Sequence, residues 1–534
     1  MRLKRNSEQN SEDESTASSV KSVESYGVFA SACSDCSECE YGSEAKQNHI
    51  YHVRANCARF YEDRETYPLL MGAKLTNTYR SMSTSSDTLG PAELSGSEII
   101  ATYKRTMQKD VKPDKNKQSS LVTIFSVWNT IMGSSLLTMA WGVERAGLPT
   151  ALILLAFMAA LCLYTAYILL RVNAHHGSET CEVPALCKVL LGSGAAALAH
   201  VFSVVVLLGA NVIYWLLITN FLYYTVNYII DVSTSTNTTV YNTSLLCPKN
   251  DLLLGISSQP FEDPSPYWSL HTTVPFYVAI IMFPLISFKN VSFFTKFNSL
   301  GTLSVFYLLI FVVIKGWIWG IHLPSTALAH GGGSDAAVLS GMLAMSFYIH
   351  NIIITVMSNN ARQENNGRDL TIAFMLVTVT YGLVGAVFYI CFPLAKSCIE
   401  DNILNNFEMH DVMTAIARIL LLFQVITVYP LIVFMLRAEA TQLCARAASP
   451  RAALAVNLAV LALCITVACL CPNIGTIIRY MGAVSGLVHV FALPALLQMR
   501  SLQIRGKLTI WKGIFYSLII IFGSVNLIMQ FFIA

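Results

Sequence analysis

The feature that most constrains this chain is a long apolar stretch with a polar interruption near its middle, between Ser119 and Gly147. A run of this length is a candidate for a membrane-spanning helix. It is interrupted at Asn129–Ser135, which reads NTIMGSS. In lipid, a break is tolerated only where it is buried in protein or lines a cavity. We therefore expect a broken first helix; the alternative is a continuous helix that packs its Gly and Ser residues against a neighbour.

A broken helix would offer binding groups of both signs. The N-terminus of its second half presents unpaired N–H groups and the positive end of a dipole, which suit a carboxylate. The carbonyls that end its first half, together with Asn129, suit a small cation. This arrangement is typical of amino acid transporters with a discontinuous first helix.

Composition indicates a polytopic membrane protein. The chain of 534 residues is 54% hydrophobic and only 13% charged, which excludes an ordinary soluble protein. No nucleotide-binding loop, catalytic triad or metalloprotease motif occurs, so we expect neither an enzyme nor a nucleic-acid-binding protein. We predict an all-α protein of about eleven transmembrane helices, near residues 119–143, 150–172, 196–230, 274–288, 294–315, 338–358, 369–392, 411–437, 452–470, 473–497 and 509–533.

Residues 1–118 are predicted to form a largely disordered tail, because they open with a low-complexity run of Ser, Glu and Asp. The segment near 49–75 is richer in aromatic and aliphatic residues, as in segments that fold on a partner. Within it, Glu65, Leu69 and Leu70 fit an acidic dileucine sorting signal, and Tyr67 begins a tyrosine-based one. Such short patterns also arise by chance.

Lys and Arg residues are more frequent in the loops that would share a side with this tail, which predicts a cytosolic N-terminus and a lumenal C-terminus. The sequons at Asn237 and Asn242 then fall in a lumenal loop and are predicted glycosylation sites. Cys247 and Cys398 also lie in lumenal loops, where an oxidising environment permits a disulfide; the alternative is two free thiols.

Two later helices also contain polar residues. His350 and Asn351 lie within the sixth helix, where they mark either a second break, as in an inverted repeat of five helices plus five, or a contact with a neighbouring helix. Thr427 precedes Pro430 in the eighth helix, and its hydroxyl with freed carbonyls would suit sodium. Arg418 is expected near the lumenal end of that helix, with its charged head in water. No Asp or Glu is expected in mid-span, which favours sodium coupling or facilitated movement over proton coupling.

Six motifs make the chain similar to a known family. Taken in order, they are SLVTIFSVWNTIMGSS, VPFYVAIIMFPLISFKNVSFFTKFNSLGTLSV, FYIHNIIIT, NNARQENNGRDLTIAFMLVTVTY, ARILLLFQVITVYPL and PNIGTIIRYMGA. Across residues 119–534 the chain resembles the sodium-coupled neutral amino acid transporters, solute carrier family 38, and above all the lysosomal, arginine-responsive branch of that family. The resemblance implies a LeuT-like fold of eleven helices with a broken first helix.

The resemblance also implies a site. Substrate would bind largely through main-chain atoms of one run of residues: Thr130, Ile131, Met132, Gly133, Ser134 and Ser135. Asn129 and Thr427 match the family's sodium-linked positions, and the Cys247–Cys398 bridge and lumenal glycans fit the family as well.

Two functions follow from the resemblance. The first is a lysosomal or late endosomal transporter of arginine, leucine, glutamine or other neutral amino acids, which also reports amino acid supply to Rag GTPases and Ragulator, upstream of the target-of-rapamycin kinase. The second is a nutrient receptor that signals through its tail with little flux. A plasma-membrane sodium-coupled transporter is a further alternative.

Overall fold

The structure is a computed structural model that describes residues 117–177, 182–234, 245–248, 267–287, 301–323, 335–444 and 450–532. The tail before residue 117, with its sorting signal, lies outside the described residues. The same is true of Asn237 and Asn242. The predictions made for these segments stay predictions.

The described part of the chain is an all-α membrane domain, as predicted. Eight of its helices are long and apolar enough to cross a membrane, and the bent pair α4 and α5 makes a ninth. Seven of the eight are single helices: α6 (Leu148–His176), α8 (Ser193–Thr234), α12 (Gly301–Trp319), α15 (Asn366–Cys391), α16 (Val412–Cys444), α17 (Pro450–Leu470) and α20 (Ile510–Phe532). The eighth is continuous through α18 (Ile474–Ser485), the π-helix η5 (Gly486–Ala492) and α19 (Leu493–Ile504).

Shorter apolar helices account for the remaining predicted spans. The first span is divided into α4 (Ser120–Ile131) and α5 (Ser135–Ala146), and the sixth into α13 (Ala336–Ser346) and α14 (Ile353–Ser358). The fourth, α10 (Val274–Ser287), contains Pro284. All eleven predicted spans are thus represented, and the first and sixth are both interrupted, as a repeat of five helices plus five requires.

Several helices are longer than predicted; α16, for example, ends at Cys444 rather than at residue 437. A short helix that was not predicted, α7 (Val183–Leu190), precedes α8. α12 extends to Trp319 rather than to residue 315, and the tenth span continues through η5 and α19 to Ile504 rather than to residue 497. Polar and basic residues near these ends lower local hydropathy, which shortened the predicted spans although the backbone remains helical.

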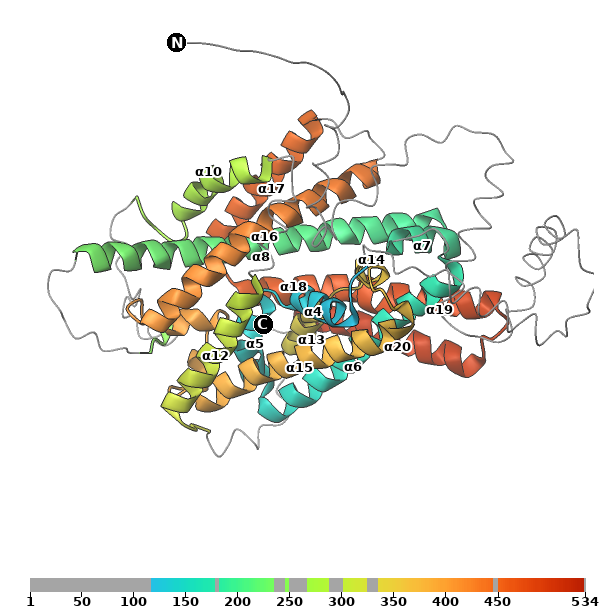
Figure 1. The fold of residues 1–534 in the computed structure, drawn as a ribbon, viewed down its shortest axis with the longest axis horizontal. Helices are drawn as coiled ribbons and strands as arrows, with labels where there is room; N and C mark the ends of the chain where they lie inside the picture. The colour runs from blue at the N-terminus through green and yellow to red at the C-terminus, as the bar shows by residue number, and fades with distance from the viewer. Residues whose placement is uncertain are drawn as a thin grey trace, which may run out of the picture.

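Figure 1 shows α8 running along most of the length of the molecule, with α16 crossing it and with α4 and α5 near the middle. α8 packs against α16, and α13 packs against α18. The second contact depends on small residues, because a β-carbon added at Gly482 would collide with the backbone carbonyl oxygen of Gly341. The two interrupted spans are therefore enclosed by continuous helices.

Candidate functional site

The break in the first span lies where the sequence placed it. α4 ends at Ile131, and Met132 leaves the helical conformation with φ −65° and ψ 108°. α5 then begins at Ser135, and the axes of the two halves differ by 62°. The N–H groups of Leu136 and Leu137, in the first turn of α5, donate to the Gly133 and Ser134 carbonyls at 3.2 and 3.1 Å. No hydrogen bond from the N–H of Gly133, Ser134 or Ser135 is present among the residues described, and the Ser134 side chain does not cap the helix. The break thus offers backbone donors inside the membrane domain.

The sixth span is interrupted between Ser346 and Ile353. The intervening backbone turns tightly: the N–H of Tyr348 donates to the Met345 carbonyl at 3.1 Å, and that of Ile352 donates to the Ile349 carbonyl at 3.1 Å. This is the second break that His350 and Asn351 indicated in the sequence. It frees the last carbonyls of α13 from the helical ladder.

One side chain on α15 joins the two breaks. The Tyr381 hydroxyl lies 3.1 Å from the carbonyl oxygen of Ile131, at the end of α4, and 3.0 Å from that of Ser346, at the end of α13. Tyr381 is 1% exposed, and its ring packs edge-on against Phe347. The single O–H proton is therefore shared between the two carbonyls that the breaks have freed. This shared hydrogen bond fixes α4 and α13 relative to each other.

A second tyrosine, on α8, lies over the break in the first span. A β-carbon at Gly133 would come 3.6 Å from the Tyr214 hydroxyl oxygen. The glycine therefore leaves a gap between the backbone and that hydroxyl. The predicted substrate run, Thr130 to Ser135, thus lies between α15 and α8, although the Thr130 hydroxyl donates to Ser126 of its own helix at 2.7 Å.

The predicted sodium-binding residues, Asn129 and Thr427, are connected through side chains on α12 and α16 that were not predicted from the sequence. Asn129 Oδ1 accepts a hydrogen bond from the Thr302 hydroxyl on α12 at 3.2 Å. Gly301, the preceding residue, lies against the Gln424 side chain on α16, where a β-carbon would come within 3.0 Å of it. The Thr427 hydroxyl donates to the Gln424 carbonyl at 2.8 Å.

We call Asn129, Thr302, Gln424 and Thr427 the oxygen cluster. Gln424 Oε1 is buried and has no hydrogen-bond partner among the residues described. Hard cations prefer such neutral and carbonyl oxygens. No hydrogen bond joins Asn129 directly to Thr427, two residues that the structure describes in full, so their joint contact with an ion stays a prediction.

His350 is completely buried and contacts a neighbouring helix. Its Nε2 lies 2.9 Å from the Thr165 hydroxyl and 3.2 Å from the Cys162 carbonyl oxygen, both on α6. The Tyr348 ring is tilted against it on one side and meets His489 of η5 on the other. His350 therefore lies in a break and also makes the helix contact that was the alternative interpretation.

Residues 245–248, which follow α8, are joined to the loop that follows α15, and together they form a cap at one end of the domain. Cys247 and Cys398 are joined by a disulfide, the pairing favoured from the sequence. The expectation that Arg418 reaches water is wrong: it is 1% exposed. Its guanidinium donates to the Leu404 carbonyl at 2.8 Å and lies 4.2 Å from the centroid of the Tyr224 ring, and these contacts substitute for water.

Beside this cap is a cavity of about 290 Å³. Its lining includes Leu216, which is two residues from Tyr214 on α8, together with the acidic side chains of Glu400 and Asp401. Asp401 accepts a hydrogen bond at 2.9 Å from the N–H of Gly475, at the start of α18. The cavity therefore lies between α8, the cap and the start of α18, and none of its lining residues belongs to the break in the first span.

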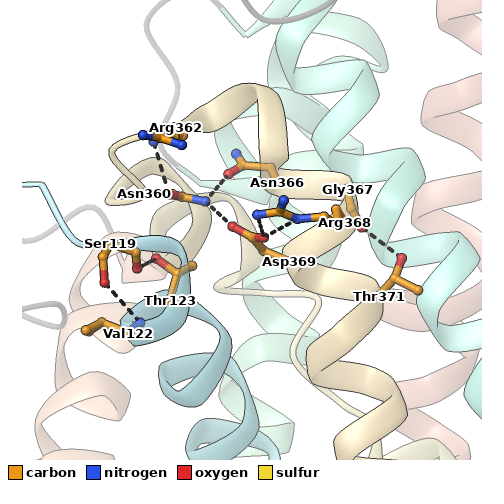
Figure 2. A network of polar contacts seen from close by, with 10 residues as sticks. All are labelled: Ser119, Val122, Thr123, Asn360, Arg362, Asn366, Gly367, Arg368, Asp369 and Thr371. Atoms are coloured by element: carbon orange, nitrogen blue, oxygen red, sulfur yellow. Dashed lines mark hydrogen bonds and ion pairs between the residues drawn. The ribbon is translucent and has the colours of Figure 1, made fainter.

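At the opposite end, the start of α4, next to Ser119, lies beside a polar network around Asn360 and Asp369 (Figure 2). The N–H of Gln118 donates to the Asn359 carbonyl, and the N–H of Ala361 donates to the Gln118 carbonyl, both at 2.8 Å. Asn360, between these two partners, is fully buried and donates to Asp369 Oδ2 at 2.9 Å. The segment that enters α4 is thus paired with the loop that leaves α14.

Comparisons with known proteins agree with this architecture. A family model described as "Transmembrane amino acid transporter protein" matches residues 116–533. The chain belongs to this transmembrane amino acid transporter family. A family member from Caenorhabditis elegans, "Sodium-coupled neutral amino acid transporter 9 homolog", is 38% identical over 462 residues, which cover 80% of this chain and 75% of that one.

"Neutral amino acid transporter 9" of Rattus norvegicus is 39% identical over 447 residues, which cover 78% of this chain and 79% of that one. Among solved structures, "Crystal structure of MhsT in complex with L-phenylalanine" aligns with a TM-score of 0.48 and 12% identity, covering 78% of this chain and 98% of that one. The resemblance to solute carrier family 38 is confirmed, and the chain is an amino acid transporter of that family.

Proposed function

We propose that this transporter moves arginine, leucine, glutamine or other neutral amino acids across the lysosomal or late endosomal membrane together with sodium. We further propose that it reports their supply to Rag GTPases and Ragulator through its N-terminal tail. The observation that carries the transport proposal is the pair of interrupted spans whose freed carbonyls share the Tyr381 hydroxyl. In an amino acid transporter, such paired breaks are suited to hold a zwitterion.

The two breaks divide the binding of the zwitterion between them. The N-terminus of α5 presents the N–H groups of Gly133, Ser134 and Ser135 to the substrate carboxylate, and the helix dipole adds to the attraction. The carbonyls of Ile131 and Ser346 are acceptors for the ammonium group. The cavity with Glu400 and Asp401 provides a negatively charged approach from the lumen, which favours cationic arginine.

Sodium binds at the oxygen cluster in this proposal. Asn129 is next to the substrate run, so an ion held by it would fix the end of α4 and thereby the carbonyls that the substrate uses. Gln424 Oε1 is buried and has no hydrogen-bond donor among the residues described, which costs free energy. A cation bound at the oxygen cluster would reduce that cost.

The deciding experiment is flux in vesicles that contain the purified protein, with labelled arginine, leucine and glutamine, in the presence and absence of a sodium gradient. Uptake that saturates and increases with sodium supports the proposal. Saturable binding of the same amino acids with no flux above protein-free vesicles would reject transport and leave the receptor function.

A receptor function is the second candidate, because the backbone pairing of Gln118 connects the junction of the tail and the first span to the loop after the sixth span. A change in that span on substrate binding would therefore act on the start of the first span. Asn360→Ala should loosen the pairing and alter capture of Rag–Ragulator by the full chain.

Asn359→Ala is the matched control for that variant. It keeps the backbone carbonyl that accepts from Gln118 and removes only a side-chain hydrogen bond to Thr355 of its own helix. Equal effects of the two variants on Rag–Ragulator capture would remove the support for this coupling.

Location and orientation are tested separately. Replacing Leu69 and Leu70 together by Ala should move the protein to the cell surface if the dileucine signal directs it to lysosomes. An unchanged lysosomal location would reject this signal, and a parent protein found at the surface would favour the plasma-membrane alternative.

A further inference from the structure

A second cavity, of about 230 Å³, lies at the end of the molecule opposite the disulfide cap. Four of its seven lining residues are Lys or Arg, and none of the seven is acidic. We call it the basic pocket. It is lined by Arg171, Gln498, Leu502, Arg505, Lys507, Lys512 and Tyr516.

The fold brings these cations together from α6, α20 and the turn between α19 and α20. Arg171 lies near the end of α6, and Lys512 lies in the first turn of α20. Arg505 and Lys507 flank Gly506, whose φ of 66° allows the turn between α19 and α20. The N–H of Lys507 bonds back to the Leu502 carbonyl at 2.9 Å, which fixes the turn.

Two further contacts hold the wall of the basic pocket in place. The hydroxyl oxygens of Tyr164, on α6, and Tyr516, on α20, are 3.2 Å apart. Lys512 Nζ donates to the Lys507 carbonyl at 3.3 Å. Cations that line one cavity repel one another, and a bound anion would reduce that repulsion.

The side of α20 next to the pocket is apolar and exposed. Ile510 and Trp511 are 82% and 81% exposed, and Phe515 and Leu518 continue the same apolar surface. Tryptophan is characteristic of the interface between the membrane and water. The basic pocket thus lies at headgroup level, beside a helix face on which acyl chains can lie.

We propose that the basic pocket binds the phosphorylated headgroup of an anionic phospholipid that carries phosphomonoesters, as phosphoinositides do. Each phosphomonoester carries a charge of about −1.5 to −2. The cations of the lining attract such groups, and arginine can bind phosphate oxygens in a bidentate way. Basic pockets between transmembrane helices on the cytosolic side recognise such headgroups. Under the topology proposed above, this end faces the cytosol.

The test measures lipid binding to the full-length, detergent-purified protein by native mass spectrometry. The probes are short-chain phosphatidylinositol bisphosphate, short-chain phosphatidylserine and soluble inositol trisphosphate. Arg171→Gln with Lys512→Gln should weaken binding of the bisphosphate lipid about 25-fold, since each cation near the surface contributes about fivefold. Lys512→Arg alone should retain binding because it keeps the charge.

Arg451→Gln with Arg500→Gln is the matched control. Both arginines are exposed, the topology assigns them to the same side of the membrane, and neither lines the basic pocket. We expect this control to bind the bisphosphate lipid as the parent does. A thermal melt within error of the parent's will show that the pocket variant is folded.

Three outcomes would overturn the proposal. Equal weakening by the control pair would mean that general surface charge binds the lipid. Equal affinity for phosphatidylserine, or for the soluble headgroup, would remove the specificity for a phosphomonoester lipid. Lipid binding that appears only after deletion of residues 1–110 would assign the pocket to the N-terminal tail instead. No outcome depends on flux, so the proposal can fail without the transport function.

Discussion

Tyr381→Phe is the sharpest test of how the two breaks are held. The substitution removes one oxygen and keeps the ring that packs against Phe347. The Tyr381 hydroxyl oxygen lies 3.1 and 3.0 Å from the carbonyl oxygens of Ile131 and Ser346, and the substitution removes this shared hydrogen-bond donor. Leaving a buried acceptor unsatisfied costs roughly 1–3 kcal/mol. The same free energy corresponds to a factor of roughly 5 to 150 in an equilibrium constant.

We expect this loss to appear in two measurements. The free energy of unfolding should fall, and the KM for amino acid uptake into vesicles should rise roughly tenfold because the binding backbone is no longer preorganised. Tyr389→Phe, further along α15, is the matched control, since no hydrogen bond from its hydroxyl is present among the residues described. A Tyr381→Phe protein that matches the parent in both stability and KM would refute the bracing role.

Two further sets of substitutions test the site, one tests the topology and one tests pH dependence. Ser134→Trp should fill the break and abolish amino acid binding while expression is retained, and Ser134→Ala should bind nearly normally. Thr302→Ala and Thr427→Ala should each raise the sodium concentration needed for half-maximal uptake; if the parent ignores sodium, the oxygen cluster is only helix packing. Replacing Asn237 and Asn242 by Gln should abolish a glycosylation shift on a gel. Burial lowers the pKa of Lys396 from 10.5 to about 8, so the unfolded chain binds more protons between these values; stability should therefore rise with pH across that window and be flat below it, and Lys396→Gln should remove the slope in thermal melts.

The spans and their breaks could be predicted because local composition determines them. An apolar run of about twenty residues is a membrane helix almost regardless of its neighbours. The Gly-Ser-Ser cluster after Met132 lowers the helical preference of the first span at that point, and this effect is local as well. The same reasoning marked the second break at His350. The Cys247–Cys398 disulfide could be predicted because the predicted topology places both cysteines in loops on the same side of the membrane.

The partners of the freed groups could not be predicted, because they depend on which helices become neighbours. Tyr381 follows a Thr-rich run of α15 and looks in the sequence like any aromatic residue of a buried helix. Thr302 is the second residue of α12, and only the packing of α12 against α4 gives it a role at Asn129. The one signal that could have suggested Tyr381 or Thr302 is a hydroxyl side chain within a membrane helix that is distant in sequence from the break.

The geometry around Tyr381 also explains how a brace and a substrate can use the same carbonyls. Each carbonyl oxygen has two lone pairs, and the tyrosine hydroxyl can occupy only one on Ile131 and one on Ser346. One acceptor position on each carbonyl is therefore left for a second donor. Under the proposed function, that donor is the substrate ammonium group, whose arrival would satisfy both remaining positions at once. A substrate so bound would strengthen the contact between α4 and α13 that Tyr381 already maintains, and so favour the arrangement in which both breaks are closed around it.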